Sequence, residues 1–103
     1  MSFTIEKKQD ILIVKLKESS CDLSLVAQRF GPDFKHIIFD LLNLLSLNES
    51  DLKNFTTFGK ENVTEGSFVI ILKGEFQEDY PIVPTLEEAF DFIEMENIER
   101  MLN

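Results

Sequence analysis

The sequence has very few of the residues that hold metal ions or form disulfides. It contains one cysteine, Cys21, and one histidine, His36. A zinc site needs a set of Cys and His ligands, which one residue of each type cannot supply. A lone cysteine cannot form an internal disulfide, and it fits a reducing compartment. We therefore expect no metal site, no cofactor and no disulfide within the chain.

Glycine is also scarce, and the four glycines stand apart at positions 31, 59, 66 and 74. A phosphate-binding loop groups its glycines within a few residues, so the chain lacks such a loop. A Ser–His–Asp arrangement would have to use His36, which opens a predicted buried strand next to Lys35. We interpret His36 as a surface or strand-edge histidine, and we predict no catalytic residue.

Basic residues are outnumbered, since the chain has 10 Lys and Arg against 19 Asp and Glu, a formal net charge of −9. A field of this sign repels the phosphates of nucleic acids and the anionic surfaces of membranes. It favours a basic protein surface as a partner, although acidic charge also serves solubility alone. We therefore expect neither nucleic-acid binding nor membrane binding.

Long apolar runs are absent as well. No stretch approaches the roughly 20 apolar residues that a helix needs to cross a bilayer. The first six residues, MSFTIE, lack the basic and apolar regions of a signal peptide. We expect a cytoplasmic protein.

The sequence does contain enough apolar material for one core. Hydrophobic residues make up 44% of the chain, and ten of them are Phe. This composition is typical of a folded protein rather than a disordered one. At 103 residues the chain has the length of one domain, which we place at 1–103.

Apolar patterns predict five strands. Residues 3–8 alternate between apolar and polar, residues 11–16 are nearly all apolar, and Gln9-Asp10 between them indicates a hairpin turn. Nearly continuous apolar runs follow at 35–40 and 67–72, the pattern of strands covered on both faces. A short strand is predicted at 82–83.

Three helices are predicted to alternate with these strands. The first begins near Asp22 and ends at Gly31, and the second runs from Asn48 to Gly59. The third starts after Thr85 and continues helical to 102, with or without a bend. The leucine-rich segment 41–47 is predicted to be a loop that packs against the core. Strands that alternate with helices imply parallel pairs joined by crossovers, so the fold class is α/β.

Asp40 is a candidate functional carboxylate, because it ends a central strand, where α/β sheets place functional residues. The alternative is that its carboxylate only binds backbone amides of the following loop. A hydrolase would need a second carboxylate for acid–base chemistry, and Glu49 is the one that we consider. A hydrolase of the ribonuclease Z type is excluded, because it needs the motif H-x-H-x-D-H and the chain has one histidine.

Three segments resemble a known family. The strand IIFDL at 37–41 is followed, after a short loop, by LNESDL at 47–52, and PTLEEA at 84–89 precedes the last helix. These segments, and the order of the elements over nearly the whole chain, resemble the STAS domain of sulfate transporters and anti-sigma-factor antagonists. The resemblance implies a mixed sheet with an N-terminal hairpin and helices mainly on one face. It also implies a role in regulatory protein–protein interaction.

The chain departs from the STAS pattern where its second helix begins. The family has Asp-Ser-Ser-Gly-Leu there, and this chain has Asn48, Glu49, Ser50 and Asp51 before Leu52. Glu49 occupies the position of the serine that a partner kinase phosphorylates in regulated members of the family. Ser50 matches the second serine of the pattern. The resemblance therefore implies that the usual phosphate acceptor is missing and that Glu49 places a permanent carboxylate at the helix N-terminus. Ordinary first-turn acids are the alternative interpretation.

We predict from these features a non-enzymatic module that binds a protein partner, such as a kinase-like or basic-surfaced regulator. The predicted partner-binding residues are Asp40, Asn48, Glu49, Ser50 and Asp51. Two other classes stay open. A small-ligand-binding protein would need polar groups that converge in a cleft, and a self-associating protein could form a homodimer through exposed Phe side chains.

Overall fold

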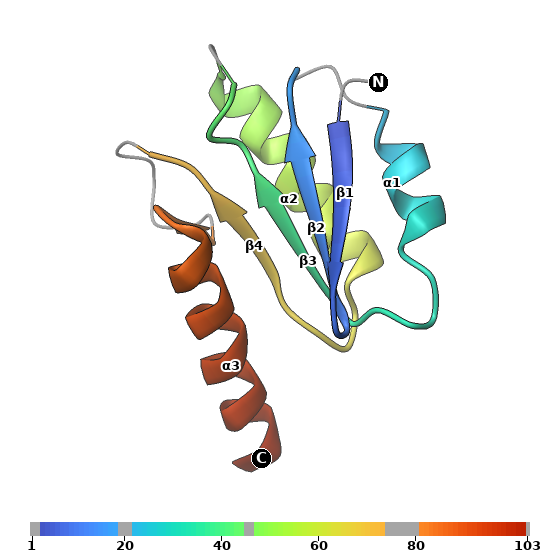
Figure 1. The fold of residues 1–103 in the computed structure, drawn as a ribbon, viewed down its shortest axis with the longest axis vertical. Helices are drawn as coiled ribbons and strands as arrows, with labels where there is room; N and C mark the ends of the chain where they lie inside the picture. The colour runs from blue at the N-terminus through green and yellow to red at the C-terminus, as the bar shows by residue number, and fades with distance from the viewer. Residues whose placement is uncertain (1–2, 19–21, 45–46, 74–80, 103) are drawn as a thin grey trace.

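The computed structural model describes residues 3–18, 22–44, 47–73 and 81–102 (Figure 1). The elements, in chain order, are β1 (Phe3–Lys8), β2 (Ile11–Leu16), α1 (Leu23–Arg29), β3 (His36–Asp40), α2 (Glu49–Asn62), β4 (Phe68–Ile71), β5 (Ile82–Val83) and α3 (Leu86–Leu102). This order agrees with the sequence prediction. Cys21 lies outside the described residues.

The strands form one mixed sheet in the order β1-β2-β3-β4-β5. β1 and β2 pair antiparallel as the expected hairpin, with Lys8 opposite Ile11. Gln9 in the turn has a φ of 55°, the left-handed conformation that two-residue hairpins favour. The pairs β2–β3, β3–β4 and β4–β5 are parallel. The mixed sheet predicted from the sequence is therefore confirmed.

Helices cover both faces of the sheet, because alternate residues of the central strands point to opposite sides. The first core cluster joins one face to α1 and α2, and it includes Leu12, Val14, Ile37, Phe39 and Ile70 from the strands, Val26 from α1, and Leu52, Phe55 and Phe58 from α2. The second cluster joins the other face to α3, and it consists of Ile11, Ile13, Ile38, Val69, Ile71, Ala89 and Ile93. Two of the three helices lie on one face, as expected, and α3 covers the other.

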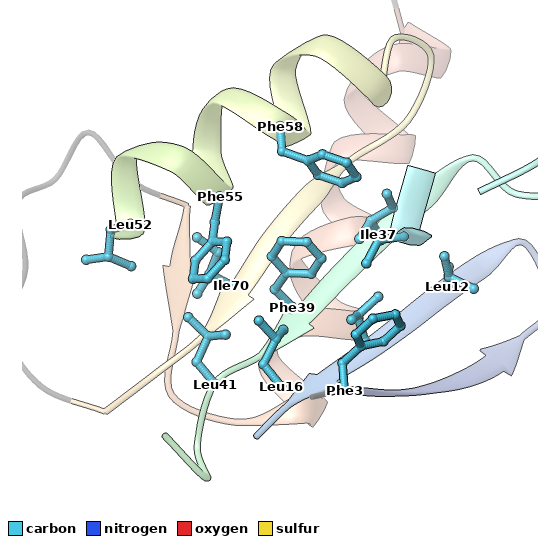
Figure 2. Close-up of a cluster of buried hydrophobic side chains, with 12 residues drawn as sticks. Phe3, Leu12, Leu16, Ile37, Phe39, Leu41, Leu52, Phe55, Phe58 and Ile70 are labelled. Atoms are coloured by element: carbon cyan, nitrogen blue, oxygen red, sulfur yellow. The ribbon is translucent and has the colours of Figure 1, made fainter. Parts of the chain in front are cut away.

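Phe39 lies fully buried at the centre of the first cluster. Figure 2 shows Phe55 and Phe58 reaching from α2 toward its ring. The ring centroid of Phe39 is 5.4 Å from that of Phe55 and 5.3 Å from that of Phe68, both edge-on, and 5.7 Å from that of Phe58, nearly parallel. Such aromatic pairs add about 0.5–1.5 kcal/mol each beyond area burial. They fix α2 over β3 and β4.

The helix starts use the residues that the sequence pattern indicates. The Asp22 carboxylate accepts a hydrogen bond from the Ser24 N–H at 3.0 Å and caps α1. The Thr85 hydroxyl accepts one from the Glu88 N–H at 3.1 Å at the start of α3. Each cap satisfies an N–H that has no partner within its helix.

The end of α2 differs from the prediction. The helix continues past Gly59 to Asn62, so Gly59 as a helix stop was wrong. Gly59 is buried, and a Cβ at this position would collide with the Phe68 ring. Glycine is needed here for close packing of α2 on β4 and not for termination. α3 is one helix from Leu86 to Leu102.

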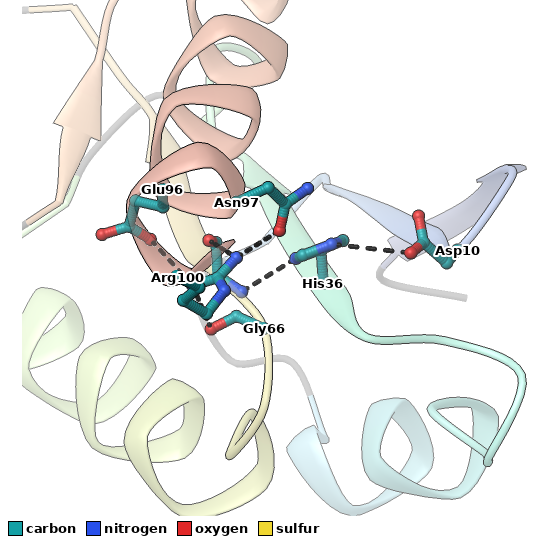
Figure 3. A network of polar contacts seen from close by, with 7 residues as sticks. Asp10, His36, Gly66, Glu96, Asn97 and Arg100 are labelled. Carbon is teal, nitrogen blue, oxygen red and sulfur yellow. Dashed lines mark hydrogen bonds and ion pairs between the residues drawn. The ribbon is translucent and has the colours of Figure 1, made fainter. Parts of the chain in front are cut away.

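The second difference concerns His36. Only 2% of this residue is exposed, so its interpretation as a surface histidine was wrong, whereas the strand-edge alternative agrees with its place as the first residue of β3. Its Nδ1 accepts a hydrogen bond from the Ser67 N–H at 2.8 Å, and its Nε2 lies 3.6 Å from an Asp10 carboxylate oxygen (Figure 3). A Cβ on Gly66 would collide with the Lys35 carbonyl, so the close approach that brings Ser67 to the ring requires glycine. The ring joins the hairpin turn to the starts of β3 and β4.

Burial lowers the pKa of His36 below its ordinary value, and the Asp10 carboxylate opposes this effect only in part. The imidazole is therefore neutral in the fold, with its proton on Nε2, since Nδ1 is an acceptor.

We predict that the free energy of unfolding falls as the pH is lowered from about 7.5 to about 5.5. The unfolded chain takes up the His36 proton first, so this contribution is complete above the unfolded pKa of roughly 6.5 and declines below it. Urea unfolding at the two pH values measures the change. The variant His36→Asn cannot titrate at this position and should show a flatter profile. An equal pH dependence in both proteins would assign the effect to other groups.

A second prediction concerns Gly59. Gly59→Ala should lower the free energy of unfolding by about 1–3 kcal/mol, because the added methyl group overpacks against Phe68. At an open helix position the same change would instead raise stability by about 1 kcal/mol. Gly31→Ala is the control for an added methyl group at an open position outside the helices, since nothing lies within 4 Å of the added Cβ there, and it should not lower stability in the same way. A Gly59→Ala protein more stable than wild type in urea unfolding would contradict the packing argument.

Candidate functional site

The candidate residues lie at one edge of the sheet. Figure 1 shows β2, β3 and β4 ending at this edge and α2 beginning there. Asp40 is the last residue of β3, and Asn48 is the N-cap of α2. The packing of α2 on Phe39 sets the direction of the helix. The structure therefore brings the strand end and the helix start to the same edge.

The first turn of α2 is closed by a reciprocal pair of hydrogen bonds. The Asn48 side-chain oxygen accepts from the Asp51 N–H at 2.8 Å, and the Asp51 carboxylate accepts from the Asn48 N–H at 3.3 Å. This capping box satisfies two backbone donors that the helix leaves free. Asn48 and Asp51 therefore mark the helix start, as the sequence pattern indicated, and they do so through a capping box.

Glu49 and Ser50 lie between these two residues, and both are exposed. Among the residues that the structure describes, neither side chain makes a hydrogen bond or an ion pair. The positive end of the helix dipole favours a carboxylate in the first turn. The helix start thus presents one carboxylate and one hydroxyl group to solvent on a capped first turn.

Asp40 is half-buried, and its carboxylate accepts a hydrogen bond from the Leu42 N–H at 3.1 Å. This confirms that Asp40 binds an amide of the following loop, the alternative that the sequence left open. Glu49 is exposed, so the two carboxylates are not buried together as an acid–base pair in a cleft would be.

Sequence reasoning missed Leu42 as a surface residue. Leu41 is buried and Leu44 packs against the core, as predicted for this loop, but 42% of Leu42 is exposed. The sequence carries no signal for this exposure, because both faces of β3 are covered and the alternation of its residues does not separate buried from exposed positions. Leu42 adds an apolar contact to the same edge of the sheet.

The structure also offers grooves that the candidate residues do not line. One of about 430 Å³ lies between β1 and α1, and its lining includes Ile5, Lys17, Leu25 and Arg29. Within the described ranges, no three His, Cys, Asp or Glu side chains are grouped as metal ligands would be. No helix in those ranges has the length and apolarity to span a membrane.

No protein family model matches the chain, and no curated protein matches its sequence. Among solved structures, the chain is similar to the crystal structure of an anti-sigma factor antagonist from Mycobacterium paratuberculosis, with a TM-score of 0.71 and 17% sequence identity. The match covers 89% of this chain and 92% of that chain. It confirms the STAS-like α/β fold that the sequence resemblance predicted. A likeness at this identity establishes the fold alone.

We predict that Asn48→Ala lowers the free energy of unfolding by about 1 kcal/mol, because the capping box is lost. Ser50→Ala is the matched control in the same turn, and it should change stability by less than about 0.5 kcal/mol at this exposed position. Urea unfolding of both variants measures the difference. Equal losses in the two variants would mean that the capping box does not hold the start of α2.

Proposed function

We propose that the chain is a cytoplasmic regulatory module that binds a protein partner through the start of α2, as an anti-sigma-factor antagonist does. The observation that carries the proposal is the pair of exposed side chains, Glu49 and Ser50, on a capped helix start in a STAS-like fold. This role needs a rigid recognition surface and no reaction. No catalytic residue is assigned.

The residues of this surface divide into two groups. Glu49, Ser50 and the exposed Leu42 contact the partner. Asn48 and Asp51 hold the first turn of α2 through the capping box, and Asp40 holds the loop through the Leu42 N–H. The fixed backbone reduces the ordering cost of binding, since less conformational freedom is lost.

The partner has a basic surface at the contact. Glu49 carries a negative charge at the edge of a chain with a net charge of −9. Complementary charge raises the rate of association and selects against acidic proteins. A kinase-like regulator with a basic patch fits this description.

Binding at this surface is not switched by phosphorylation of residue 49. Glu49 occupies the position that carries the acceptor serine in the STAS pattern. A phosphate group brings nearly two negative charges and three acceptor oxygens, whereas a carboxylate brings one charge. Glu49 therefore gives a constant and weaker charge in place of a reversible one.

Affinity capture tests the proposal. The tagged wild-type chain should retain a specific partner from a lysate of its native cells, identified by mass spectrometry, and Glu49→Ala/Ser50→Ala should lose it. The matched control Thr57→Ala/Glu61→Ala changes an exposed hydroxyl and an exposed carboxylate farther along α2 and should keep the partner.

One result would count against the proposal, and a second would amend it. A partner retained by all three proteins would place the interface elsewhere. Release of the captured partner on addition of ATP and Mg²⁺, with a phosphate located on Ser50 by tandem mass spectrometry, would show that the second serine of this turn keeps the switch that position 49 lacks.

A further inference from the structure

The C-terminal half of α3 exposes most of the large apolar side chains found on the described surface. The exposed fraction is 64% for Met95, 52% for Ile98, 83% for Met101 and 81% for Leu102. Isolated apolar residues are normal on a protein surface, but four within two helical turns form a patch. Figure 1 shows this part of α3 projecting past the end of the sheet at which β3 and β4 begin.

The patch lies on the side of α3 that faces away from the sheet. Successive residues of an α-helix are rotated by about 100°, so Met95, Ile98 and Leu102 form a stripe opposite Ala89 and Ile93, which pack on the sheet. The spacing of three and then four residues is that of the a and d positions of a coiled coil. The stripe therefore has the geometry of a helix-docking seam and not of a second core face.

The stripe is held on a fixed helix. The Arg100 guanidinium donates to the Ser67 hydroxyl at 3.0 Å and to the Asn97 side chain, and it lies 3.9 Å from a Glu96 carboxylate oxygen (Figure 3). It also reaches the Gly66 carbonyl at 3.5 Å. These contacts tie the last turns of α3 to the start of β4, which lowers the entropy cost of docking a partner there.

Acidic side chains flank the stripe. α3 carries six acidic residues and one basic residue, Arg100, which is already engaged. Glu94 and Glu99 occupy the g and e positions on either side of the stripe, and both are exposed. Charges at these positions set the choice of partner in helix pairs. Glu94 and Glu99 therefore favour an opposing helix that carries Lys or Arg at the facing positions.

We propose that this face of α3 docks an amphipathic helix of a partner protein, with an apolar a/d stripe flanked by Lys or Arg. A second copy of this chain is disfavoured as the occupant, because Glu94 and Glu99 would face the same residues of the copy. The surface is separate from the start of α2, since α2 and α3 lie on opposite faces of the sheet. The chain can then hold two partners at once.

A pair of synthetic helical peptides, about three heptads long, tests the proposal. Both carry Leu at the a and d positions, and one carries Lys at e and g where the other carries Glu. The full chain should bind the Lys peptide in fluorescence anisotropy and bind the Glu peptide at least about tenfold more weakly. Chemical shift changes in an amide NMR spectrum should cluster at 91–102.

Two variants, one of the stripe and one of its flanks, separate docking on the apolar stripe from attraction between the net charges of chain and peptide. Met95→Gln/Ile98→Gln should weaken binding of the Lys peptide by about tenfold or more. Glu94→Lys/Glu99→Lys should reverse the preference, so that the Glu peptide binds more tightly. The control Glu18→Lys/Glu61→Lys makes the same change in net charge at exposed positions outside α3 and its contacts, and it should leave the preference unchanged.

Three outcomes would overturn the proposal. The first is equal binding of the Lys peptide by wild type and by Met95→Gln/Ile98→Gln. The second is a reversal of preference by Glu18→Lys/Glu61→Lys as large as that by Glu94→Lys/Glu99→Lys. The third is a wild-type dimer in light scattering that Met95→Gln/Ile98→Gln abolishes, since a second copy would then cover the stripe. The peptide assay does not involve Glu49 or Ser50, so its result is independent of the capture experiment.

Discussion

The packing of α2 on Phe39 is the contact on which the rest of this structure depends. Phe55 and Phe58 bring two rings from the helix to the centre of β3, and Phe68 brings a third from β4. The contact sets where α2 lies on the sheet and therefore where it begins. The parallel strands end at one edge of the sheet, and the first turn of α2 lies at that same edge. The proposed recognition surface consists of a few exposed side chains, and this aromatic cluster packs the helix that carries them against the sheet.

The helices on the two faces of the sheet bring exposed residues to opposite ends of the molecule. α1 and α2 cover one face, and α2 presents its N-terminus at the edge where the strands end. α3 covers the other face and runs back, so that its C-terminal half lies near the start of β4, where Arg100 meets Ser67. Each helix thus has one side that belongs to the core and one end that is free for contacts. The buried His36 lies beside the Arg100 anchor and joins β3 to β4 at the same edge.

Most of the fold could be predicted from the sequence, since its elements have strong local patterns. The alternation in β1, the apolar runs of β3 and β4, and the cap residues Asp22 and Thr85 all act over a few residues. The errors have a common cause. Gly59 has the local appearance of a helix stop, but its role is set by the Phe68 ring on a different element. His36 resembles a surface residue, but its partner Ser67 lies 31 positions away in the sequence.

The sequence by itself determined the α/β class, the order of the elements, the acidic charge and the presence of a carboxylate at position 49. These follow from periodicity and composition, which need no knowledge of distant contacts. Only the tertiary structure decided which polar residues are free and which are engaged. Asn48 and Asp51 are held by each other, whereas Glu49 and Ser50 between them face solvent. The same is true of Met95, Ile98 and Leu102, whose helical spacing is that of a core stripe. Only the structure shows that these three residues are exposed. A helix on a sheet buries one side, and in α3 the buried side is the one with Ala89 and Ile93.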